Sequence, residues 1–90
     1  MGNYHGAIHE LKTQQPYFTQ IEAGAKLFEL RKDDRAFAAD DLLNLREWLP
    51  EEGYTGCALC AVVTCIVRGD PWLQPGYVAL GIRVLKEPAP

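Results

Sequence analysis

The hydrophobic positions at the start of the chain change their period twice. Residues 7–12 alternate weakly between two faces, as a short strand does. Residues 13–16 then begin a helix, because Pro16 is tolerated in a first turn and the apolar side chains after it recur at helical spacing until Gly24. This pattern predicts a short strand followed by one helix of about two or three turns.

The next segment returns to the two-residue period of a strand. Phe28 and Leu30 share one face, whereas Leu27, Glu29 and Arg31 share the other. Because the second face carries most of the charge, we expect a strand with one face in water. Polar turns over 32–35 and at 40–41 then separate it from the next apolar run.

Apolar runs alternate with breaker-rich segments in the second half of the chain. The predicted segments are a strand over 42–49, a hairpin loop over 50–56, a loop over 68–76 and a last strand over 77–85. Residues 57–67 are nearly all apolar and β-prone, which predicts a strand that is either buried on both faces or at the centre of a closed sheet. Residues 86–90 are expected to form a frayed tail.

These elements predict a mainly β (α+β) fold with about five strands and one short helix near the N-terminus. The pattern contains no βαβ rhythm, repeat or linker, so we expect an antiparallel or mixed barrel rather than a doubly wound sheet. Ninety residues fit one domain, which we place over residues 1–90 with an ordered core over 7–85.

The composition, with 48% hydrophobic and 23% charged residues, is that of an ordinary globular protein. Nine Lys and Arg residues against twelve Asp and Glu residues give a formal net charge of −3. The chain therefore lacks the overall positive field that draws proteins onto phosphate backbones. A pocket for one nucleotide or one flipped base stays compatible with this charge, because stacking and a few placed charges suffice there.

Nothing in the sequence predicts a membrane or secretory role. No run reaches the roughly eighteen uncharged apolar residues of a membrane helix. Residues 1–6 lack the apolar core of a signal peptide and the Ser or Thr of a myristoylation site. We therefore expect a cytoplasmic protein without a membrane partner.

The three cysteines, Cys57, Cys60 and Cys65, crowd into one short segment. This is not the spacing of a secreted disulfide framework, so we expect them to be reduced. Residues three apart on a strand point to opposite faces, and no second Cys or His pair follows at zinc-finger spacing. We therefore expect buried thiols that act as small hydrophobic groups, with neither a metal site nor a cofactor.

Most of the candidate chemistry lies between Gly24 and Arg31. Lys26, Glu29 and Arg31 are close in sequence, and the last two share a strand face with about 7 Å between them. A carboxylate can accept from a base amide, while a guanidinium can fork onto a carbonyl or phosphate. The alternative is a solvated strand face with ion pairs that contribute about 0–1 kcal/mol.

The run from Gly24 to Arg31 resembles the Gly-x-Lys-x-x-Glu-x-Arg signature of ASCH domains in the PUA-like superfamily. Further segments resemble a small phage and bacterial branch of that group, described as RNA-binding and ASCH-like. They are His9–Lys12, Tyr17-Phe18, Phe28–Arg35, Leu45–Trp48, Tyr54–Gly56 and Gly76–Gly81, within a similarity that runs from about His9 to Ile82. The resemblance implies a PUA-like pseudo-barrel with a cleft beside the helix, an RNA or modified-nucleoside ligand, and Lys26, Glu29 and Arg31 as the cleft residues.

Two positions depart from the pattern of that group. Asp40 and Asp41 stand where a Gly-Asp turn is expected, which is tolerable because Asp visits the left-handed region more easily than most residues. Leu27 stands where a small polar residue is common, so that face of the cleft is expected to be drier.

Some ASCH relatives are amidohydrolases that deacylate a modified cytidine with a Lys, a Thr three residues later and a distant Glu. Lys26 fits the first place, but Glu29 occupies the place of the nucleophile. Thr64 is the remaining candidate, and a Thr on that apolar strand is more typical of a core residue bonded to backbone. Lys26 is therefore the one residue that this resemblance supports as catalytic.

Two aromatic side chains could also contact a ligand. Trp72 lies in a loop of breakers, where a base could stack on it with about 1–3 kcal/mol, or where it could close one end of the barrel. His9 begins the His-Glu-Leu-Lys match and could serve either as a ligand contact or as a strand-end residue bonded to backbone.

The sequence leads to the hypothesis of an RNA- or nucleotide-binding module. Its cleft would use Lys26 and Arg31 for phosphate or carbonyl oxygens and Glu29 for an amide edge. Two other classes stay open, namely a small amidohydrolase acting on an acylated nucleoside and a phage-derived domain that binds a host protein. The last of these predicts an exposed apolar patch, and the sequence does not separate the three.

Overall fold

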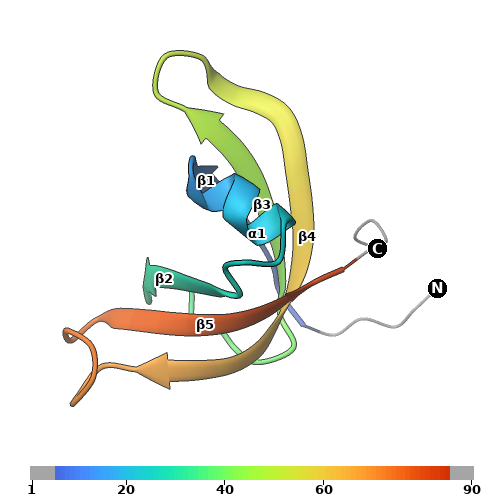
Figure 1. Ribbon diagram of the computed structural model, residues 1–90. Coiled ribbons are helices and arrows are strands. Elements are labelled where there is room, and N and C mark those ends of the chain that lie inside the picture. The colour runs from blue at the N-terminus through green and yellow to red at the C-terminus, as the bar shows by residue number, and fades with distance from the viewer. Residues whose placement is uncertain (1–5, 86–90) are drawn as a thin grey trace.

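The computed structural model describes residues 6–85, in which five strands and one short helix form a curled half-barrel (Figure 1). The elements are β1 (Ile8–Gln14), α1 (Tyr17–Glu22), β2 (Phe28–Lys32), β3 (Leu42–Leu49), β4 (Gly53–Arg68) and β5 (Tyr77–Val84). The mainly β fold predicted from the hydrophobic pattern is confirmed. The expected tail over 86–90 and most of the segment 1–6 searched for targeting signals lie outside the described residues.

The sheet has the order β1-β3-β4-β5-β2 and is mixed, which is one of the two predicted alternatives. β1 runs parallel to β3, and the other pairs are antiparallel. The long strand β4 pairs with β3 through its first half and with β5 through its second half, with a register shift between Val63 and Cys65. Because one strand serves both halves, the sheet curls and β2 and β5 cross β3 and β4 (Figure 1).

The turns account for most differences from the predicted boundaries. β3 has the predicted limits, but β4 already begins at Gly53, so the hairpin loop is shorter than the predicted 50–56. Gly53 has φ +76°, a conformation that lets the chain reverse at once. Similarly, β1 continues through Gln14, and the helix begins only after Pro16, so α1 is shorter than expected.

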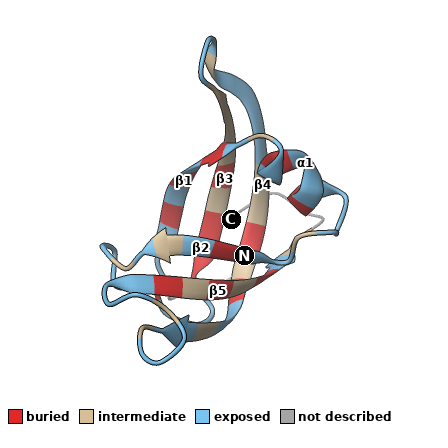
Figure 2. Cartoon of the chain, turned by 60° about the vertical axis from the view of Figure 1, so that its left-hand side comes forward, coloured by how far each residue is buried: buried red, intermediate tan, exposed pale blue. Residues whose placement is uncertain are grey.

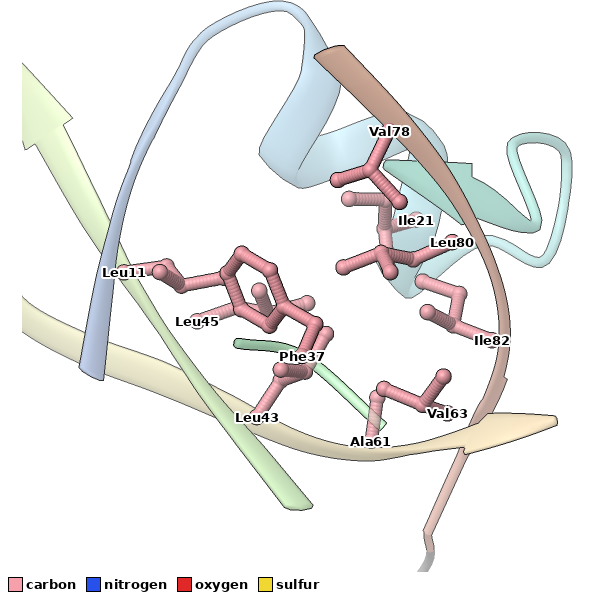
Figure 3. Packing of buried hydrophobic residues seen from close by; sticks show 10 residues of the cluster. All are labelled: Leu11, Ile21, Phe37, Leu43, Leu45, Ala61, Val63, Val78, Leu80 and Ile82. Atoms are coloured by element: carbon pink, nitrogen blue, oxygen red, sulfur yellow. The ribbon is translucent and has the colours of Figure 1, made fainter. Parts of the chain in front are cut away.

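The core lies on the concave side of the sheet. Phe37, from the segment between β2 and β3, packs among apolar side chains of β1 and β3, while Ile21 of α1 packs toward β5 (Figure 3). The buried cluster consists of Leu11, Ile21, Phe37, Leu43, Leu45, Ala61, Val63, Val78, Leu80 and Ile82. Burial of a side chain of this size contributes about 1.5–3 kcal/mol, so this cluster holds the helix against the sheet.

β4 is the middle strand of the sheet order, but the predicted burial of residues 57–67 on both faces is wrong. Ala61 and Val63 are buried, but most other positions of β4 are half-buried or exposed (Figure 2). The reason is that the half-barrel curls around one side only, and its convex side is left open to water. Consequently the thiols of Cys57 and Cys65 are exposed rather than buried, although all three cysteines are free.

Candidate functional site

The charged face of β2 points into the half-barrel. Glu29 lies opposite Leu80 and Arg31 opposite Val78 in the β2–β5 ladder, and both of these partners are fully buried. Because directly opposite residues share a face, Glu29 and Arg31 share the concave side. The expectation that this face is solvated is therefore wrong for Glu29, and the apolar side chain of Leu30 on the other face is the exposed one.

The end of α1 places Lys26 beside this face. Gly24 ends the helix with φ +81°, and the backbone N–H of Lys26 donates to the carbonyl of Gln20 at 3.1 Å. The following residue is held to β5, because Ile82 N–H donates to the Leu27 carbonyl at 3.1 Å. Lys26 is thus fixed between the helix and β2, with its side chain directed back toward Glu29.

Lys26, Glu29 and Arg31 form one ionic cluster. Lys26 Nζ donates to Glu29 Oε2 at 3.0 Å, while Arg31 Nε and Nη2 donate to Glu29 Oε1 at 2.9 and 2.7 Å. The Glu29 side chain is only 5% exposed, against 14% and 24% for Lys26 and Arg31. A carboxylate offers about four acceptor positions, and these bonds occupy three of them.

The cluster forms one wall of a pocket of about 380 Å³. The lining residues are Thr13, Tyr17, Lys26, Phe28, Glu29, Leu30 and Arg31. Lys26 Nζ lies 5.4 Å from the ring centroid of Tyr17 and 4.7 Å from that of Phe28, so the ammonium is close to both aromatic rings. Charged groups and aromatic surface therefore meet in the same hollow.

Two arginines span the gap between β2 and the opposite edge strand β1. Arg31 Nη2 donates to the Lys12 carbonyl at 2.9 Å, and Arg35 Nη1 donates to the Glu10 carbonyl at 2.7 Å. Between them lies a second pocket of about 180 Å³. Its lining residues are Leu11, Arg31, Lys32, Asp34, Arg35 and Phe37. Arg31 is therefore common to both pockets.

His9 lines neither pocket and is buried against Asp41. His9 Nε2 is 2.9 Å from Asp41 Oδ2, and the backbone N–H groups of Ala38 and Ala7 donate to the same carboxylate at 2.9 and 3.1 Å. Burial on its own would raise the pKa of Asp41, but the hydrogen bonds from His9 and from the two backbone groups outweigh it and lower that pKa. This arrangement ties the start of β1 to the turn before β3.

The other predicted contact residues also lie outside the two pockets. Trp72 is 79% exposed in the loop between β4 and β5. Thr64 is exposed on β4, where its hydroxyl lies 3.9 Å from the thiol of Cys65, so the expectation of a core threonine is wrong. The structure thus brings together Lys26, Glu29 and Arg31, and places His9, Trp72 and Thr64 elsewhere.

Four residues that line the larger pocket were not assigned as ligand contacts from the sequence, namely Thr13, Tyr17, Phe28 and Leu30. Thr13 was assigned to the helix entry, yet it is buried in β1 and lines the larger pocket. Tyr17 and Phe28 supply the aromatic walls. For Tyr17, its position directly after Pro16 was the available signal in the sequence. The pocket depends on the approach of β1 and β2, which are distant in sequence and not hydrogen-bonded partners in the sheet.

Two features are absent from residues 6–85, namely a membrane-spanning helix and a cluster of metal-binding side chains. None of their helices is long and apolar enough to cross a bilayer. Nor do their His, Cys, Asp and Glu side chains gather in a group of three or more that could hold a metal ion.

The fold and the pockets define a small, mainly β half-barrel protein with a charged and aromatic hollow between its two edge strands. The chain belongs to the family described as a domain of unknown function (DUF3850), whose model matches residues 8–82. It is also 37% identical over 83 residues to the "Uncharacterized 12.9 kDa protein in GpA 3'region" of Escherichia phage P2. That similarity covers 92% of this chain and 73% of the phage protein.

Proposed function

We propose that this chain is an ASCH-like domain of the PUA-like type that binds RNA or a modified nucleotide in the cytoplasm. The larger pocket is the binding site. Lys26 and Arg31 contact phosphate or carbonyl oxygens, Glu29 accepts from an amide edge, and the base lies against the aromatic walls. The match to the Gly-x-Lys-x-x-Glu-x-Arg signature supports this assignment.

The observation that carries the proposal is the unfilled acceptor capacity of Glu29. Its carboxylate is nearly buried, faces the 380 Å³ pocket, and has used about three of four acceptor positions on Lys26 and Arg31. An amino or imino N–H of a nucleobase can take the remaining position. Buried polar sites of this kind discriminate strongly, because a ligand without the donor leaves the acceptor unpaired.

The aromatic walls add the second part of base recognition. Tyr17 and Phe28 are each about half exposed, so their rings can cover a base that enters the pocket. Stacking of this kind contributes about 1–3 kcal/mol per base in single-strand binders. The net charge of −3 favours selective binding in the pocket over general binding along a phosphate backbone.

Titration calorimetry with nucleosides, nucleoside monophosphates and short RNAs at low salt tests the proposal. We expect saturable binding to the wild type and a loss of about tenfold or more in the Glu29→Ala, Arg31→Ala double variant. The control is the Glu51→Ala, Arg83→Ala double variant. It removes the same two charge types from the exposed hairpin turn and from the exposed side of β5.

Equal affinities of the wild type and the Glu29→Ala, Arg31→Ala variant would falsify the assignment. Turnover of an acylated nucleoside that disappears in Lys26→Ala would replace it by the amidohydrolase role. A stable complex with a protein, lost when the exposed Leu30 is changed to Ser, would replace it by the protein-binding role.

A further inference from the structure

Both pockets lie in one gap between β1 and β2, with Arg31 as the partition. Thr13 lines the larger pocket and Leu11 the smaller one. These residues alternate with Lys12 on β1, so their side chains share a face about 7 Å apart. Arg31 reaches the Lys12 carbonyl between them. The two hollows are therefore neighbours on the two sides of a single guanidinium.

The smaller pocket has the groups that an anion requires. Arg31, Lys32 and Arg35 line it, against one acid, Asp34, which is 67% exposed and lies 3.9 Å from Arg35. Within residues 6–85, Arg31 Nη1, Arg35 Nη2 and Lys32 Nζ make no hydrogen bond. Donors thus remain for an oxyanion, although the chain as a whole is acidic.

We infer that the smaller pocket is a phosphate subsite, so that the ligand is a nucleoside phosphate or an RNA strand and not a free base or nucleoside. This inference rests on the proposed function for the base, which lies in the larger pocket. The ribose lies beside the Arg31 side chain, and the Arg31 guanidinium contacts both the base and the phosphate. Arg35 and Lys32 then hold the phosphate from the far side.

The test compares one nucleoside with its monophosphate and with inorganic phosphate, by calorimetry and by amide chemical shifts over residues 31–37. We expect the monophosphate to bind about tenfold more tightly than the nucleoside. Inorganic phosphate alone should shift these amides in the wild type. The binding of the monophosphate should weaken with salt, and its logarithmic slope should fall by about one for each cation removed.

Three variants separate the subsite from the base pocket. Lys32→Ala and Arg35→Ala should each lower the affinity for the monophosphate about tenfold and leave the affinity for the nucleoside unchanged. Asp34→Asn should raise the affinity for the monophosphate, because it removes the one acid of the lining. Arg83→Ala is the charge-matched control, because it removes an exposed cation of β5. Lys32→Ala is expected to fold normally, because Lys32 Nζ makes no hydrogen bond within residues 6–85.

The outcomes of this test distinguish the inference from the proposed function. If nucleoside and monophosphate bind equally and the variants have no effect, the phosphate subsite is overturned while the base pocket stands. If no nucleoside binds but inorganic phosphate shifts residues 31–37 in the wild type and not in Arg35→Ala, the subsite stands and the base pocket fails. Absence of any phosphate-dependent shift overturns the subsite in either case.

Discussion

The half-barrel holds two carboxylates at nearly the same burial, and their surroundings differ in kind. The side chains of Glu29 and Asp41 are 5% and 6% exposed. Asp41 accepts from His9 and from two backbone N–H groups, whereas within residues 6–85 Glu29 accepts only from the long side chains of Lys26 and Arg31. Backbone donors are fixed by the fold, but flexible cationic side chains can turn toward a ligand. Burial alone therefore does not distinguish a carboxylate held by backbone donors from one held by side chains that can move.

The largest expected effect concerns Asp41→Ala. This change leaves His9 and the N–H groups of Ala7 and Ala38 without their acceptor, so we expect the free energy of unfolding to fall by about 3 kcal/mol. Glu29→Ala should cost about 1–2 kcal/mol, because Lys26 can turn into the open pocket. Urea unfolding measures both, and equal losses would contradict the distinction between the two carboxylates.

Ligand affinity should depend on Glu29 more than on Asp41, which is the reverse of the order expected for stability. Glu29→Gln keeps the shape of the side chain but loses acceptor strength and the negative charge. We expect it to lower nucleotide affinity about tenfold, or about 1.4 kcal/mol. Asp41→Asn, the matched change at the other carboxylate, should leave the affinity within about twofold. Calorimetry at fixed salt is the measurement, and a loss in Asp41→Asn as large as that in Glu29→Gln would contradict the expectation.

Acid should lower the stability of the fold through Asp41, whose pKa in the folded state lies below its ordinary value of 3.8. A lowered pKa means that the stabilisation is complete above the unfolded value and is lost as the pH falls through the folded one. The stability difference between the wild type and Asp41→Asn should therefore shrink as the pH drops below 3.8. Glu47, whose pKa is also lowered, titrates in both proteins and cancels in this comparison. A difference that stays constant with pH would contradict this role.

The smallest effect is expected in the segment that precedes Asp41. Ala36 is exposed and has φ 51°, a left-handed conformation that costs a residue with a Cβ about 1 kcal/mol or more. Ala36→Gly removes that strain but adds unfolded-state entropy, so a net gain of about 0.5 kcal/mol is expected. Thermal unfolding measures it. Destabilisation would show that the Ala36 methyl group contributes to the fold in some other way.

Local patterns predicted the parts of the fold that local chemistry decides. The apolar run over 42–49 between two breaker-rich segments predicted β3 with its observed limits, and the Asp40-Asp41 turn indeed places Asp40 at φ 74°. The convergence of Glu29 and Arg31 followed from their spacing on one strand. These features depend on neighbours in the sequence, so one sequence suffices to predict them.

The rest depends on contacts between distant segments. Periodicity cannot tell which apolar face is covered, and β4 therefore appeared more buried than it is. Thr13 lines the larger pocket only because β1 approaches β2 across the open side. The pairing of His9 with Asp41 likewise spans 32 positions and left no local signal.

The two arginine contacts to β1 also protect this edge strand from pairing with a strand of another copy of the chain. An outer strand of a sheet exposes a row of carbonyl groups that a strand of another molecule can join, which is a common start of aggregation. Here the carbonyls of Glu10 and Lys12 are already occupied by Arg35 and Arg31. Protection of this edge and the proposed ligand recognition thus depend on the same side chains.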